Sequence, residues 1–275
     1  MKRLLRNFAF TAGAFLTIAL VLVALAAPLL SPFDPNAQDT FRRLEPPSKQ
    51  HLLGLDDLGR DVLSRILFGA RVSLRVGFSV VILASVIGIT LGAMAGYFGG
   101  AVDTVVMRIT DILLAFPGIL LAIALVAVLG PSLNNVILAL ATIGWVGYAR
   151  LVRGQVLKVR EMEFVTAAKA LGARSPRVII RHVLPNVINP VIVMATLGLA
   201  GAILAEAALS FLGLGVQPPT PSWGAMLTAG RRYLGLANHL AIYPGIAIML
   251  AVMGLNFLGD GLIDALDPKY RKMLT

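Results

Sequence analysis

Cysteine is absent from the 275-residue sequence, and charged residues are scarce. Without cysteine the chain forms no disulfide and offers no thiolate to a metal. His51, His182 and His239 lie far apart, and none has a second histidine one helical turn away, so we expect no metal site. Charged residues make up 14% of the chain, against about 25% in soluble globular domains. These shortages exclude most soluble classes and predict a membrane protein that binds no cofactor of its own.

A nucleotide-binding loop is also missing. The sequence nowhere has the spacing G-x-x-x-x-G-K-[ST], whose glycine-rich backbone cradles phosphates. The chain therefore does not hydrolyse ATP by that route, and an ATP-driven process would need a separate ATPase chain. Paired catalytic residues of other kinds are not evident either, which argues against an intramembrane enzyme.

Long apolar runs are what the sequence has instead. Hydrophobic residues make up 57% of the chain, and a spanning helix needs about 20 consecutive apolar residues. The uncharged run 112–149 is too long for one span, and Gly130-Pro131-Ser132 interrupts it. We predict an all-α polytopic protein with six transmembrane helices, over residues 7–33, 76–102, the two halves of 112–149, 188–212 and 241–259.

The first apolar run has a second interpretation, as a cleaved signal peptide. Ala24-Leu25-Ala26 resembles a cleavage site, but the run 7–33 is longer than the apolar part of an ordinary signal peptide. A retained helix is therefore favoured. We predict two parts: residues 1–70, with this helix and an extracytoplasmic loop, and residues 71–275, a core of five spans with a loop at 150–187.

The cations indicate the orientation. The net charge is +10, and eight Lys or Arg residues gather in the loop 150–186, which the positive-inside rule places in the cytoplasm. Attraction to anionic lipid explains such cations better than nucleic acid does. Arg231-Arg232 would then lie outside, against the rule. Both termini are expected in the cytoplasm, because cations flank them: Lys2, Arg3, Arg6, Lys269, Arg271 and Lys272.

The outer loop contains a predicted amphipathic helix within residues 51–71. Its apolar residues Leu58, Val62, Ile66 and Leu67 share one face, which would lie on the outer membrane surface. The nearby carboxylates lack the ligand spacing of a calcium loop. We expect a platform for a soluble partner, with the candidate contacts Asp56, Asp57, Arg60 and Asp61.

Small and polar residues within the core have structural interpretations. Gly88, Gly92 and Gly96 recur every four residues and predict close packing against another helix. The next charges are expected in a short turn, as anchors at the membrane interface; they are Asp103, Arg108 and Asp111. Trp223 and Tyr233 are expected as interface anchors in the proline-rich segment 213–240, which would dip partly into the membrane.

Glu206 lies within an otherwise apolar span. An ionisable group there is costly, so it is a candidate for contact with a cationic substrate or for a proton relay. A relay would make the chain a stand-alone proton-coupled carrier. The structural alternative is a glutamate bonded to a neighbouring helix. Tight packing by small residues on the same helix supports it; they are Gly198, Gly201, Ala202, Ala205 and Ala208.

The segment from Glu163 to Pro185 predicts two short helices joined by a sharp turn. Gly172 suits a left-handed helix end, and Ser175-Pro176 suits an N-cap followed by proline in the first turn. Leu184-Pro185 is expected to end the second helix, because proline cannot donate a backbone hydrogen bond. Two capped helices in one loop favour a docking surface over a plain connection.

This segment resembles the loop of permease subunits of binding-protein-dependent ABC importers. That loop reads Glu-Ala-Ala, three residues, Gly, nine residues, Ile, one residue, Leu-Pro. Ala167-Ala168, Gly172 and Leu184-Pro185 stand at this spacing, while Thr166 and His182 replace the glutamate and the isoleucine. Further blocks resemble the smaller permease of the dipeptide/oligopeptide/nickel importer family: LGLDDLGRDVLSR, GYFGG, MRITDILLAFP, AEAALSFLGLGVQPPTPSWGAML and NFLGDGLIDALDP.

The resemblance implies a type I ABC importer permease fold in the cell inner membrane, and a transport subunit that is not an enzyme. It implies four partner chains: a second permease, two ATPase subunits that hold ATP and Mg²⁺, and an extracytoplasmic substrate-binding protein. Dipeptides or oligopeptides are the implied cargo, with nickel or another small solute as the alternative. Contact with the ATPase is implied for Phe164, Thr166, Ala167, Ala168, Leu171, Gly172, Leu184 and Pro185.

Overall fold

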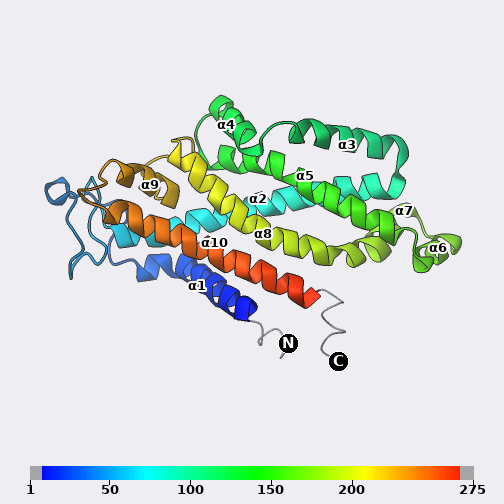
Figure 1. Cartoon of the computed structure of the whole chain (residues 1–275), viewed down its shortest axis with the longest axis horizontal. Helices are drawn as coiled ribbons and strands as arrows, with labels where there is room; N and C mark the ends of the chain where they lie inside the picture. The colour runs from blue at the N-terminus through cyan, green and yellow to red at the C-terminus, as the bar shows by residue number, and fades with distance from the viewer. Residues whose placement is uncertain (1–7, 267–275) are drawn as a thin grey trace.

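The chain folds into a bundle of long helices (Figure 1). The computed structural model describes residues 8–266, and within that range it contains helices and loops but no β-strand. The longer helices are α1 (Phe8–Leu30), α2 (Val62–Phe98), α3 (Gly100–Leu114), α4 (Gly118–Leu129), α5 (Leu133–Val159), α8 (Leu184–Phe211) and α10 (His239–Leu266). The shorter ones are η2 (Thr40–Arg42), α6 (Glu163–Ala170), α7 (Ser175–Val178), the π-helical turn η3 (Ile179–Val183) and α9 (Trp223–Arg231). The cations expected beside the termini lie outside the described residues; they are Lys2, Arg3, Arg6, Lys269, Arg271 and Lys272.

Up to six segments of the described chain can cross a membrane. Five are helices of sufficient length and hydropathy: α1, α2, α5, the helix from Ser175 to Phe211, and α10. The sixth candidate is the pair α3 and α4, which are bent by 87° relative to each other at a short break and form a broken span or a re-entrant loop. The prediction of an all-α polytopic protein is confirmed, with five candidate spans, or six if the bent pair counts as one span.

The second span begins earlier than we predicted. Residues 51–61 form turns, and α2 runs without a break from Val62 to Phe98. Its 37 residues correspond to about 55 Å, longer than the hydrocarbon core of a bilayer. Residues 62–71 are thus the first turns of a spanning helix. The expected separate helix on the membrane surface is wrong, and the boundary at residues 70 and 71 falls inside α2.

The third span differs as well. Asp103, Arg108 and Asp111 were expected in a short turn, but they lie on α3. This helix ends near Ala115, and α4 starts after Pro117, whose ring removes a backbone donor and disfavours a continuous helix. The expected interruption of the apolar run is present further on, where α4 ends at Leu129 and α5 begins at Leu133.

The glycine stripe of α2 packs against α5, as predicted. A Cβ atom added to Gly92 would lie 2.4 Å from the backbone oxygen of Ala149, and one on Gly88 would lie 2.4 Å from the Cβ of Tyr148. Such distances leave no room for a side chain, so the two backbones approach as closely as glycine permits. A buried cluster along α2, α5 and the start of α8 fills the rest of this contact.

The first helix is part of the folded bundle. A Cβ on Gly13 would lie 2.2 Å from the backbone nitrogen of Leu258 on α10, and one on Gly254 would lie 2.7 Å from Leu16. α1 and α10 run side by side in Figure 1, at the lower face of the view. This close packing supports a retained helix for the first apolar run.

The two ends of the bundle are built differently. Figure 1 shows α6 and α7 at one end, with α9 and the loop after α1 at the other. Trp223, expected as a membrane anchor, is only 2% exposed and donates from Nε1 to the Ile66 carbonyl at 3.0 Å. It fits there because Gly69 has no side chain; a Cβ on that glycine would lie 2.7 Å from the indole. The anchor interpretation of Trp223 is therefore wrong.

Candidate functional site: the α6 turn, an apolar pocket and the outer loop

α6 ends in the left-handed turn that the sequence predicted. The amide of Ala173 donates to the Ala168 carbonyl at 3.0 Å, and the amide of Gly172 donates to the Lys169 carbonyl at 2.9 Å. This is a Schellman motif, and it gives Gly172 a φ of +82°, which glycine adopts without steric cost. A Cβ on Gly172 would meet no atom of this chain within 4 Å. The glycine shapes the end of α6 and leaves the space beside it open.

One side of α6 is fixed and the other is exposed. Val165 is fully buried and shares a cluster with Val178 and Val183. The side chains of Phe164 and Leu171 are 41% and 89% exposed, so α6 presents a large apolar group at each of its ends. Of the residues expected to contact an ATPase, Ala168 and Leu184 are half-buried, and these are exposed: Phe164, Thr166, Ala167, Leu171, Gly172 and Pro185.

The second short helix departs from the prediction at both ends. Arg174 occupies the N-cap position expected for Ser175, which is instead the first residue of α7. At the other end, the helix does not stop at Leu184-Pro185 but continues into α8. The π-helical turn explains this: the amide of Leu184 donates to the Ile179 carbonyl, five residues back, and this wider turn accommodates Pro185 without breaking the helix. α7 and α8 are therefore directly continuous.

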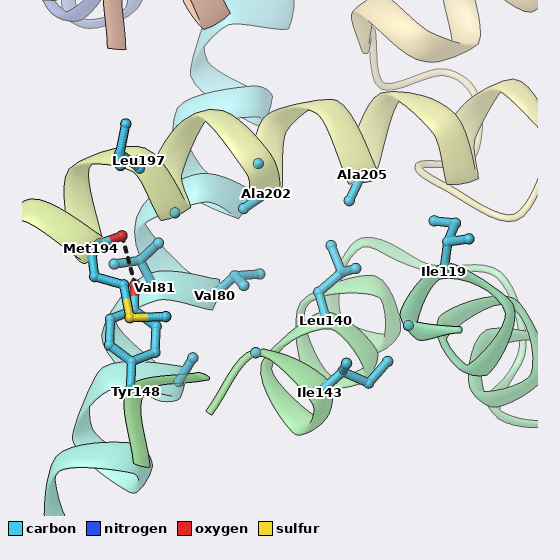
Figure 2. A pocket seen from close by; sticks show the side chains of 15 residues that line it. Val80, Val81, Ile119, Leu140, Ile143, Tyr148, Met194, Leu197, Ala202 and Ala205 are labelled. Carbon is cyan, nitrogen blue, oxygen red and sulfur yellow. Dashed lines mark hydrogen bonds between the residues drawn. The ribbon is translucent and has the colours of Figure 1, made fainter. Parts of the chain in front are cut away.

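A pocket of about 430 Å³ lies between α2, α4, α5 and α8, and the sequence analysis did not single it out. Ala202 and Ala205 on α8 face Leu140 and Ile143 on α5 across it (Figure 2). None of its lining residues is charged. Tyr148 lies at one end of the view. The pocket can admit an uncharged or apolar group, but it has no partner for a charged one.

Small residues of α8 line this pocket, although we expected them to pack tightly. Nothing lies within 4 Å of a Cβ on Gly201. Gly198 is the exception, since its Cβ would lie 2.7 Å from the hydroxyl of Tyr148. That hydroxyl donates to the Met194 carbonyl at 3.4 Å. The run of small residues was thus a usable signal for a pocket, and it was attributed to helix packing instead.

Glu206 is fully buried on α8 and is not among the residues that line the pocket. The hydroxyl of Ser210 donates to Glu206 Oε1 at 2.6 Å and lies 3.5 Å from the hydroxyl of Ser222. Ser222 in turn caps α9 by accepting from the Ala225 amide at 3.2 Å. Oε2 of Glu206 has no hydrogen-bond partner among the described residues. These contacts join α8 to the start of α9, and they favour the structural alternative over contact with a substrate.

The residues expected to dock a soluble partner hold the outer loop together. Arg60 Nε lies 2.7 Å from Asp56 Oδ2, and Arg60 Nη2 lies 3.6 Å from Asp57 Oδ1. Asp61 accepts from the backbone amide of Ser64 at 2.8 Å, which caps α2. Asp56, Arg60 and Asp61 are all buried, while Asp57 is half-buried. In this conformation three of the four are not at the surface.

Other residues form the exposed surface of this loop. Phe41 in η2 is 100% exposed, and Leu52 is 61% exposed. The only sequence signal for Phe41 is an apolar residue between polar neighbours, which is common in loops, and Leu52 is followed by the apolar Leu53 and has no such signal. Elsewhere, no three His, Asp or Glu side chains within residues 8–266 come together as metal ligands.

Known families and structures account for this arrangement. Residues 88–272 match the inner membrane component of binding-protein-dependent transport systems, and residues 1–47 match the N-terminal transmembrane domain of oligopeptide transport permease C. The chain is 48% identical to the dipeptide transport system permease protein DppC of Alkalihalophilus pseudofirmus, over 98% of this chain and 89% of that protein. It is 44% identical to the glutathione transport system permease protein GsiD of Pectobacterium atrosepticum, over 98% of this chain and 90% of that protein.

The fold is also found among solved structures. A chain from an inward-facing structure of the MetNI methionine ABC transporter matches with a TM-score of 0.56 and 19% identity, over 74% of this chain and 96% of that chain. The family match covers more than half of the sequence and includes α5, α6 and the pocket helix α8. The chain therefore belongs to the family of inner membrane components of binding-protein-dependent transport systems.

Proposed function

We propose that this chain is the permease subunit of an ATP-driven importer that carries dipeptides or oligopeptides across the cell membrane. The observation that carries the proposal is the exposed apolar surface of α6, with Phe164 in its first turn and Leu171 beside the turn at Gly172. An exposed apolar patch on a rigid turn is a suitable docking surface for another protein. The peptide cargo rests on relatives named as dipeptide and glutathione permeases, since glutathione is itself a small peptide.

The orientation follows from the same surface. α6 belongs to the loop richest in Lys and Arg, so it lies in the cytoplasm under the positive-inside rule. α1 begins and α10 ends on the side that points toward the α6 end (Figure 1), which supports cytoplasmic termini. Arg231 belongs to the opposite end and stacks over the ring of Phe211, with 4.8 Å between its Cζ and the ring centroid. This contact gives Arg231 a partner at the outer end; Arg232, the other cation that departs from the rule, is exposed.

The partners follow from what the chain lacks and what it exposes. It has no phosphate-binding loop, and the family to which it belongs implies two separate ATPase subunits that hold ATP and Mg²⁺, one of which receives α6. A second, related permease completes the membrane unit, and a substrate-binding protein delivers peptide at the outer loop. The apolar pocket is a candidate wall of the path between the permeases, because it is open and uncharged.

ATP drives this cycle only if it favours one arrangement over another. A contact between α6 and the ATPase that is equally strong in both states would shift nothing. Because α7 continues into α8 through η3, a displacement of the loop reaches the pocket helix without passing a flexible joint. Outward opening would follow ATP binding, and hydrolysis would reset the cycle.

Reconstitution tests the proposal directly. Proteoliposomes with this chain, its second permease, the two ATPases and the binding protein should take up a labelled dipeptide only when ATP is present. Proteoliposomes with this chain alone, under an imposed pH gradient, should take up none. Uptake in the second experiment would instead support the stand-alone carrier with Glu206 as its relay, and uptake of nickel but not peptide by the full complex would change the cargo.

A further inference from the structure

Two pairs of oppositely charged side chains join α3 to α5. Arg153 meets Asp103 with two prongs: Nη2 donates to Oδ2 at 2.6 Å, and Nε donates to Oδ1. Arg150 lies about one turn before Arg153 on α5 and pairs with Asp111. A two-pronged contact between a guanidinium and a carboxylate fixes geometry as well as distance. We call these four residues, Asp103, Asp111, Arg150 and Arg153, the α3 clasp.

Little else holds α3 in place. Only Val106 and Thr110 are buried on this helix. Val106 belongs to the buried cluster along α2 and α5, and Met107 and Leu113 pack against it. The apolar side chains of Val105, Ile109 and Ile112 are all exposed, however, so α3 buries only one narrow face. The clasp is therefore a large part of what positions α3. Its inner pair is the stronger one, because Arg153 and Asp103 are 33% and 21% exposed, against 47% and 53% for Arg150 and Asp111.

Residues at the end of α5 and on α6 also contact the corner between α2 and α3. Arg160, at the end of α5, donates from Nη1 to the Gly96 carbonyl at 2.8 Å. Lys169, on α6, lies 5.1 Å from the centroid of the Tyr97 ring. One cation from the end of α5 and one from α6 thus contact this corner. α6 and the corner are therefore positioned to move together.

The α3 clasp lies between α6 and the pocket. On one side, α5 ends at Val159, and α6 begins at Glu163. On the other, α3 leads through the break at Pro117 into α4, whose first residues Gly118 and Ile119 line the pocket. The 87° bend between α3 and α4 means that a shift of α3 along its axis would move α4 sideways. Such a movement would change the width of the pocket.

We infer that the α3 clasp transmits movement of α6 to α3 and α4, and so couples the ATPase cycle to the pocket. This inference rests on the proposed function. Asp103 and Arg153 are then positioning residues, because they touch neither ATP nor cargo. Asp103 and Asp111 were predicted to be anchors at the membrane interface. Their pairing with Arg153 and Arg150 gives them a different role.

A clasp that transmits movement and a clasp that only stabilises the fold predict different effects on ATP hydrolysis and peptide uptake. If the clasp only braced the fold, breaking it would lower ATP hydrolysis and peptide uptake together, along with the amount of assembled complex. If it transmits movement, the ATPases continue to turn over while transport fails. The informative quantity is therefore the number of peptides imported per ATP hydrolysed, measured on complexes that purify with all subunits.

The test uses the complete complex in proteoliposomes with its binding protein. Asp103→Asn and Arg153→Gln should each lower peptide import per ATP by about tenfold, with ATP hydrolysis retained, since coupling free energies typically correspond to such factors. Asp111→Asn, in the exposed pair, should lower it by about twofold. Arg108→Gln is the matched control: Arg108 is an exposed cation on the same helix with no ion pair among the described residues, and the ratio should not change.

Restoring the link should restore transport. The charge swap Asp103→Arg with Arg153→Asp should recover most of the lost coupling. Because the chain has no cysteine, Asp103→Cys with Arg153→Cys also creates a unique pair for a short, reducible methanethiosulfonate cross-linker. The reduced pair should be uncoupled, and the cross-linked pair should import peptide per ATP at close to the wild-type ratio. Reduction should abolish the recovery.

Three results would overturn the inference. They are a wild-type ratio in both single variants, an equal fall in hydrolysis and uptake, and a cross-link that blocks uptake, which would show that α3 and α5 must separate. Wild-type complex that shows no ATP-dependent peptide uptake would instead overturn the proposed function itself. The two failures are therefore distinguishable in one set of preparations.

Discussion

The two ends of the bundle, with α6 at one and the outer loop at the other (Figure 1), differ in whether their predicted contact residues are exposed. At the α6 end, Phe164, Leu171 and Gly172 are exposed, as a docking surface requires. At the outer end, Asp56 and Arg60 are buried within the loop that was expected to expose them to a partner. The first set was identified through the family resemblance, with Gly172 also indicated by its backbone conformation, whereas the second was a set of charged residues on a predicted platform. Charge in a loop serves internal pairing as readily as contact with a partner, so it is the weaker guide.

The largest effect on transport is expected at the α6 turn. Gly172→Trp should lower ATP-dependent uptake by more than tenfold, because the indole would project into the space where the ATPase docks, and losing a central contact of an interface costs at least about 2 kcal/mol. The chain itself offers no clash at this position. Uptake in proteoliposomes and copurification of the ATPase measure the effect.

Gly235 provides a matched control at the other end. It has a φ of +88°, and a Cβ there would also meet nothing within 4 Å. Gly235→Trp therefore carries the same backbone strain, of about 1 kcal/mol, without facing an ATPase. If both variants lose uptake equally, strain and not docking explains the effect at Gly172.

The largest effect on stability is expected in the outer loop. Asp61→Ala should lower the free energy of unfolding by about 3 kcal/mol, because it removes the cap of α2 and a partner of a buried pair. His51 Nδ1 lies 2.9 Å from the same carboxylate, and its ring would lose this partner. Thermal unfolding of the purified chain in detergent measures the change. Asp34→Ala, at an exposed aspartate in the same loop whose carboxylate accepts from the Asn36 amide at 2.8 Å, should cost less, about 1 kcal/mol or below.

The α6 turn could be predicted because its signals are local. A left-handed φ is nearly specific to glycine, so Gly172 identified the helix end from its own residue type. The break between α4 and α5 was found for the same reason, since glycine and proline stand together there. In each case the physics involves only a few neighbouring residues.

The features that were missed depend on partners distant in the sequence. Trp223 is buried because Gly69 on α2 makes room for it, and nothing near Trp223 in the sequence indicates this. Asp103 appeared to be an interface anchor because Arg153 lies 50 positions away. Pro185 was expected to end a helix, and the π-helical turn before it keeps the chain helical. For each of these residues, the sequence pattern indicated the role that is most common for its residue type, and a distant contact or the preceding turn changed that role.

A smaller effect is expected where the outer loop is exposed. If the binding protein docks on this loop, Phe41→Ser should raise the concentration of binding protein needed for half-maximal uptake by about fivefold, since truncating an ordinary contact residue costs about 1 kcal/mol. Phe41 is 100% exposed, so stability should not change. An unchanged requirement would place docking elsewhere on the outer end, and Leu52→Ser would be the next variant to measure.

The smallest effect is expected at Asp57, the one docking candidate that is not fully buried. Its carboxylate lies 3.6 Å from Arg60 Nη2, beyond good hydrogen-bond distance, and Arg60 keeps its closer bond to Asp56. Asp57→Asn should therefore change the free energy of unfolding by less than about 0.5 kcal/mol. Asp56→Asn, which weakens the close pair, should cost more. If Asp57→Asn leaves stability intact but weakens uptake at limiting binding protein, this carboxylate meets the partner, and the charge-based prediction survives at the one position where the loop leaves its charge within reach.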